Sequence, residues 1–179
     1  MTTEQQTYRT QLVNLIEQEN SKRQAQKIAE LIAQKPELFS ALVDLFLNAS
    51  PTLSMRASYV AEFVYLRDTS LVEPHIEFMA RHVLDFPHTG TQRNLLKILA
   101  RCPLPKENLG YLLQACFDLV ENAITPPAVK VWSLELLYRI GLQEPEINGE
   151  LRLILEALYE TGSAGEKVRS RDILKKMNH

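Results

Sequence analysis

The sequence predicts an all-α protein, an α-α superhelix of about five antiparallel helix pairs. Apolar residues recur at the three- and four-residue spacing of an amphipathic helix from one end of the chain to the other. Alternating stretches bounded by Asn-Gly or Asp-Gly, which would indicate strands and hairpins, do not occur. Basic residues open every second predicted helix at a nearly constant separation, so the same structural unit is expected to recur.

Length and composition are those of an ordinary globular chain. The 179 residues are enough for one sizeable core, and no long linker interrupts them, so a single domain over residues 1–179 is expected. The formal net charge of -2 argues against a dedicated nucleic-acid binder, which usually carries a strongly basic face. The beginning of the chain lacks the pattern of a secretion signal and no apolar run could span a bilayer, so we expect a cytoplasmic location.

The first half of the chain contains five predicted helices separated by short joints. The first two carry one apolar stripe each, made of Tyr8, Leu12, Leu15 and Ile16 and of Ala25, Ile28, Ala29 and Ile32. Pro36 suits the start of a third helix at 36–47, because proline at the first helical position loses no hydrogen bond. Helices at 54–66 and 70–84 follow, the second with Pro74 near its start, where proline is tolerated.

The second half contains predicted helices at 91–101, 106–121, 125–141, 145–160 and 166–177. In the helix at 125–141, Thr125 suits the N-cap, and Pro126 and Pro127 suit the first helical positions. Two apolar stripes follow, one of Val129, Trp132, Leu136, Leu137 and Ile140 and one of Val131, Leu134 and Tyr138. A helix inside a stack contacts its own partner and the neighbouring pairs, so it buries two sides, and Trp132 is expected in the core.

The repeat is carried by basic residues and by short matching segments. Arg23, Arg56, Arg93, Lys130 and Arg169 are separated by 33, 37, 37 and 39 residues, and AQKIAE at 25–30 matches ASYVAE at 57–62. Together with VKVWSLELLYRIG, KVRSRDIL and SMRASYVAEF, this pattern resembles the HEAT repeat family of armadillo-type helical repeats. The resemblance implies an outer helix, a tight turn and an inner helix that opens with a Val-Arg-like pair. It says little about function, because such repeats serve many roles.

The leading functional hypothesis is a non-catalytic helical-repeat scaffold or adaptor that binds a protein or peptide partner through a concave groove. The predicted partner-binding residues are Arg56, Arg93, Lys97 and Lys130. In the competing interpretation these basic residues form a structural ladder with acidic residues near the turns of adjacent repeats. The candidate acidic partners are Asp44, Asp68, Asp85, Asp118 and Glu121. Formation of a homodimer through the convex side is left open.

Two other classes of function stay as alternatives. One is a nucleic-acid-binding or repair module similar to the HEAT-like DNA alkylation-repair glycosylases, whose clefts are strongly basic. The other is a helical lyase of the adenylosuccinate lyase type, but its signature loop, rich in Ser and Gly, has no counterpart in this chain. Phosphate-binding loops and the HExxH and GxSxG motifs do not occur in the sequence, so we expect neither catalysis nor a cofactor.

Histidine and cysteine give no clear sign of a metal site. His75 and His82 are seven residues apart and share a helix face, but the usual spacing of four between two ligands is missing. We therefore expect an exposed pair and no metal. Cys102 and Cys116 form no CxxC motif, and two buried free thiols are expected.

Overall fold

The computed structural model describes residues 3–178, so residues 1, 2 and 179 lie outside the account that follows. Over the described residues the chain forms ten α-helices and three short 3-10 helices and no strand, which confirms the predicted all-α fold class. The chain divides into two compact units, Met1–Pro103 and Leu104–His179. The expectation of one domain over residues 1–179 stays a prediction.

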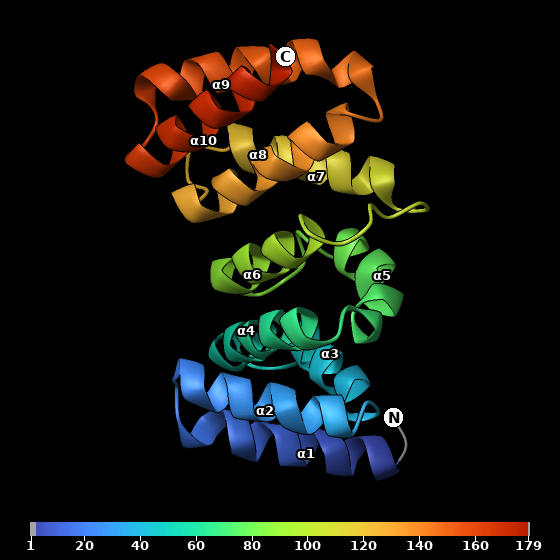
Figure 1. Cartoon of the computed structure of the whole chain (residues 1–179). Coiled ribbons are helices and arrows are strands. Elements are labelled where there is room, and N and C mark those ends of the chain that lie inside the picture. The colour runs from blue at the N-terminus through green and yellow to red at the C-terminus, as the bar shows by residue number, and fades with distance from the viewer. Residues whose placement is uncertain (1–2, 179) are drawn as a thin grey trace. The chain divides into compact units, whose positions relative to one another are not determined.

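The first unit contains three successive helix pairs. Its helices are α1 (Thr3–Gln18), α2 (Lys22–Gln34), α3 (Leu38–Asn48), α4 (Pro51–Arg67), α5 (Ile76–Arg81) and α6 (Thr89–Leu99). We call α1, α3 and α5 the outer row and α2, α4 and α6 the inner row of this unit (Figure 1). Along the inner row α2 packs against α4 and α4 against α6, so every pair is joined to the next.

Side-chain caps fix several of the helix starts in this unit. Ser21 caps α2, where its hydroxyl accepts a hydrogen bond of 3.1 Å from the backbone N–H of Gln24. Pro51 occupies the first turn of α4, where no backbone donor is needed. His88, which lies in a joint, caps α6, because its Nδ1 accepts a 2.9 Å bond from the N–H of Gly90. These caps and the proline therefore define the residues at which α2, α4 and α6 begin.

The predicted helix at 70–84 is wrong in its first half. Two 3-10 turns, Thr69–Leu71 and Glu73–His75, precede α5, which covers only Ile76–Arg81. Pro74 has no N–H and disfavours the helical conformation of the residue before it, so an α-helix begins only after this proline. Pro36 likewise lies before its helix, because α3 begins at Leu38.

The second unit contains two helix pairs. Its helices are α7 (Leu109–Glu121), α8 (Pro127–Gly141), α9 (Asn148–Thr161) and α10 (Ala164–Met177), and a 3-10 turn, Pro145–Ile147, precedes α9. We call α7 and α9 its outer row and α8 and α10 its inner row, since α8 packs against both α7 and α10. A capping box starts α10, in which the N–H of Ser163 donates to the Glu166 carboxylate at 2.7 Å.

Helix α8 begins one residue later than the sequence indicates. Thr125 was expected to be the N-cap, but Pro126 takes that position and the helix begins at Pro127. A proline holds the residue before it in extended backbone. Pro126 accordingly has φ -59° and ψ 142°, which pushes Thr125 outside the helix.

The first apolar stripe of α8 is largely buried, whereas the second is fully buried only at Leu134. Val129, Leu136, Leu137 and Ile140 are buried on the first stripe. Trp132 is only half-buried, so its predicted place in the core is wrong, and Val131 and Tyr138 of the second stripe are half-buried as well. In the first helix, α1, the single stripe buries Leu12 and Ile16 and leaves Tyr8 and Leu15 half-buried.

Candidate partner-binding surface

Ion pairs join neighbouring helices of the inner row in the first unit. Glu62 of α4 pairs with Lys97 of α6 and lies 3.6 Å from the guanidinium of Arg101, just after that helix. Glu30 of α2 lies 3.8 Å from Arg67 at the end of α4. Each pair therefore links a carboxylate on one inner helix to a cation on the next.

The pair of Glu62 and Lys97 is the most buried of these links. The side chain of Glu62 is only 8% exposed, so the cations beside it take the place of the water that this carboxylate lacks. Lys97, one of the predicted partner-binding residues, thus takes the structural role that the ladder interpretation assigned to it. The acidic partners of the basic inner-helix residues are not the aspartates expected near the turns. Asp44 bonds to Arg9 of α1, and Asp85 bonds to His82.

The second unit contains a link of the same kind. Arg169 of α10 pairs with Glu135 of α8, and its guanidinium also lies over the ring of Trp132, 5.6 Å from the ring centre. This contact explains why Trp132 stays near the surface. Lys130, another predicted partner-binding residue, is buried in α8 with 8% of its surface exposed. Little of its side chain is therefore accessible to a partner.

A buried polar network fixes Arg93 beside the start of α4. The guanidinium of Arg93 donates to the side-chain oxygen of Asn94 at 3.1 Å. The amide of Asn94 in turn donates to the Ser58 hydroxyl at 3.0 Å and to the carbonyl of Met55 at 3.3 Å. Because Asn94 is almost fully buried, this network sets the position of Arg93 relative to α4.

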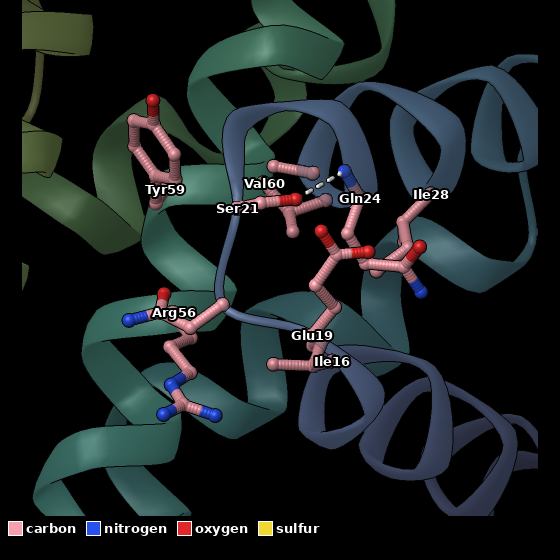
Figure 2. Close-up of a pocket in the computed structure, with 10 residues that line it drawn as sticks. Ile16, Glu19, Ser21, Gln24, Ile28, Arg56, Tyr59 and Val60 are labelled. Carbon is pink, nitrogen blue, oxygen red and sulfur yellow. Dashed lines mark hydrogen bonds between the residues drawn. The ribbon is translucent and has the colours of Figure 1, made fainter.

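Arg56 lies on α4, opposite the turn between α1 and α2. It lines a small depression together with Glu19, Ser21 and Tyr59, as Figure 2 shows. The volume of about 10 Å³ leaves room for one water molecule and none for a partner's side chain. The Nε of Arg56 is buried and has no hydrogen-bond partner among the described residues. No carboxylate of residues 3–178 is paired with Arg56 or with Arg93.

A family model described as HEAT repeat domain matches residues 12–177, which covers both units. The chain belongs to the HEAT repeat family. No curated protein and no solved structure matches it in the corresponding searches. The resemblance read from the basic residues that open alternate helices is thereby confirmed.

Within each unit of this HEAT repeat protein, charge is separated between the inner and the outer row. In the first unit, the inner helices carry seven basic and two acidic side chains, whereas the outer helices carry two basic and four acidic ones. In the second unit the inner helices carry seven basic and three acidic side chains and the outer helices one and five. Basic and acidic side chains on different helices nearly cancel in the formal net charge of -2, so composition alone does not reveal that the inner helices are basic.

The histidines and cysteines do not gather into a site. His75 stacks edge-on against Phe39 with ring centres 5.2 Å apart, and its burial lowers its pKa, whereas His82 bonds to Asp85 at 2.9 Å. No cluster of three metal-ligating side chains occurs among the described residues. Cys102 and Cys116 are both buried free thiols, as expected.

No helix in the described part of the chain is long and apolar enough to cross a membrane.

Burial gives Cys116 a testable pH dependence. Loss of solvation raises the pKa of its thiol from the ordinary 9.0 to about 12, against a weaker opposing hydrogen bond with Ser133. The unfolded chain therefore ionises this thiol at lower pH than the folded chain does. We expect the free energy of unfolding to fall as the pH rises from 9 towards 12. Urea denaturation at several pH values measures how steeply the free energy of unfolding falls with pH.

The matched control for this prediction is Cys116→Ala. In this variant the slope above pH 9 should be smaller than in the wild-type protein, because one of the ionising groups is gone. Equal slopes in the two proteins would show that Cys116 does not contribute.

Proposed function

We propose that this HEAT repeat protein is a non-catalytic scaffold or adaptor that binds a protein or peptide partner through its inner helices. Membership of the HEAT repeat family supports the scaffold role, since helical repeats offer extended surfaces for binding. The cytoplasmic location and the homodimer left open by the sequence stay predictions.

The separation of charge between the rows is the observation that carries this proposal. Lys97 of the first unit is paired with Glu62 and so joins α6 to α4, whereas Lys130 is buried in α8 of the second unit. Arg56 and Arg93 are half-buried and have no carboxylate partner among residues 3–178. Charged groups that the fold does not neutralise are the ones available to a partner. We therefore propose Arg56 and Arg93 as the contact residues and Lys97 as their support, and a role of Lys130 in binding stays a prediction.

The test compares capture of partners by the wild-type protein and by the double variant Arg56→Glu/Arg93→Glu. Both proteins are immobilised, exposed to native cell extract, and the bound proteins are identified by mass spectrometry. The wild-type protein should retain a defined set of proteins that the double variant loses, because the charge that attracts them is reversed. Lys35→Glu, an exposed change in the joint after α2, is the matched control and should retain the set. Unchanged capture by the double variant would contradict the assignment of the contact residues.

A nucleic-acid-binding function is the second candidate, because a basic row also suits a phosphate backbone. It predicts that the protein shifts duplex DNA in a gel at low salt, and that the affinity falls steeply as salt is raised. The scaffold proposal predicts no such shift. A salt-sensitive shift of DNA that the double variant Arg56→Glu/Arg93→Glu abolishes would show that these residues bind nucleic acid and would contradict a protein partner.

A further inference from the structure

An apolar stripe lies on the exposed side of α4, within the basic inner row of the first unit. Tyr59, Phe63 and Leu66 follow one another at spacings of four and three residues and so share one helix face. We call these three residues the α4 stripe. Leu66 is 60% exposed and Tyr59 is half-buried, whereas Phe63 lies at the limit of burial. A large leucine side chain is thus left in solvent beside two aromatic rings.

The two aromatic side chains of the α4 stripe pack against each other. The rings of Tyr59 and Phe63 meet edge to face with their centres 5.1 Å apart, a favoured geometry for aromatic pairs. Tyrosine and phenylalanine have few rotatable side-chain bonds, so ordering them on binding costs little entropy. Rigid aromatic side chains are common anchors in protein interfaces.

Basic residues lie at both ends of the stripe. Arg56 precedes Tyr59 by three residues on the same helix, and the network through Asn94 places Arg93 near the same end. Arg67 directly follows Leu66, and its pair with Glu30 at 3.8 Å is solvent-exposed, so a partner's carboxylate can still reach this guanidinium. From Arg56 to Arg67 the helix rises by roughly 17 Å at about 1.5 Å per residue. The chemical order along α4 is therefore cation, apolar surface, cation.

From this order we infer that the inner row of the first unit binds an acidic amphipathic helix of a protein partner. Its large apolar side chains, spaced by four and three residues, pack on the α4 stripe, and carboxylates at its two ends meet Arg56 with Arg93 and Arg67. Charge complementarity with the row of seven basic and two acidic side chains selects an acidic partner. This inference rests on the proposed scaffold function and specifies the chemistry of its partner.

The test uses the full chain and a dye-labelled peptide of about four helical turns. The peptide carries leucines at the spacing of the α4 stripe and glutamates at both ends, and its scrambled version has the same composition. Fluorescence anisotropy should show binding of the designed peptide and at least roughly tenfold weaker binding of the scrambled one, which cannot place its leucines on one face. Equal affinity for the two peptides would overturn the apolar part of the inference.

Two leucine variants locate the binding surface. Leu66→Asp should weaken binding of the designed peptide by roughly tenfold or more, since it removes an anchor and adds a repelling charge. Leu153→Asp changes an equally exposed leucine on the outer helix α9 and should leave the affinity unchanged. Both sites are solvent-exposed, so both variants should fold, and circular dichroism checks this. Equal effects of the two variants would contradict the inference.

Failure of this inference can be told apart from failure of the scaffold function. Capture from cell extract could depend on Arg56 and Arg93 while Leu66→Asp leaves both the affinity for the designed peptide and the set of captured proteins unchanged. In that case the inner row binds partners without the α4 stripe. If neither the designed peptide nor extract proteins bind, both proposals are wrong. Binding of duplex DNA that is unaffected by Leu66→Asp would also overturn the acidic helix as the occupant. A concentration-dependent rise in mass by light scattering, abolished by Leu66→Asp, would instead assign the surface to a second copy of the chain.

Discussion

Replacing Lys97 by glutamate is expected to lower the free energy of unfolding by about 3 kcal/mol, because it breaks a buried ion pair. The variant places a second carboxylate beside Glu62, whose side chain is only 8% exposed. Arg101, at 3.6 Å, is the cation that remains next to Glu62 and offsets part of the loss. Urea denaturation followed by circular dichroism measures the change.

Two further variants separate the effect of this ion pair from a general effect of charge. Lys27→Glu makes the same charge change at an exposed position of α2 and should alter the stability by about 0.5 kcal/mol at most. Adding Glu62→Gln to Lys97→Glu should recover part of the lost stability, since the repulsion between the two carboxylates disappears. A stability of Lys97→Glu within about 0.5 kcal/mol of the wild type would show that the link between α4 and α6 is not structural.

Truncation of leucines on both stripes of α8 is the second large effect. Leu134→Ala and Leu136→Ala should each lower the free energy of unfolding by about 3 kcal/mol, because both side chains are fully buried and each change leaves a cavity. Leu142→Ala, at a position 66% exposed just after α8, is the control and should cost less than about 0.5 kcal/mol. Thermal or urea unfolding of the three variants gives these values.

The comparison of Leu134 with Leu136 tests the claim that an inner helix buries two sides, because residues two apart point to different sides of a helix. A helix that lies on the surface of a bundle has one apolar side, and truncation on its other side costs little. A small loss for Leu134→Ala together with a large loss for Leu136→Ala would therefore assign α8 to the surface of such a bundle.

Much of the fold could be predicted from the sequence because helices leave a strong periodic signal. The spacing of apolar residues located every α-helix, and the two stripes of α8 correctly indicated an inner helix. The errors in the helix bounds fall where proline competes with that pattern. Pro74 delays the start of α5 and Pro127 moves the cap of α8 from Thr125 to Pro126, and neither shift changes the apolar periodicity.

The candidate surface was harder to predict because it depends on which helices lie next to each other. Glu30, Glu62 and Glu135 are the carboxylates of the ladder, yet each lies within an inner helix and not near a turn. The separation of charge between the rows also becomes visible only once every helix is assigned to a row. The distribution of charge helix by helix along the chain was the signal that could have revealed it.

An amide chemical-shift titration of the full chain with the designed acidic peptide tests most directly whether the inner helices bind the partner. We expect the largest shifts on the inner helices of the first unit, centred on α4 between Arg56 and Arg67. Helices α1, α3 and α9, which belong to the outer rows, should change little. Largest shifts on these outer helices would contradict the claim that the basic inner row is the binding surface of this HEAT repeat protein.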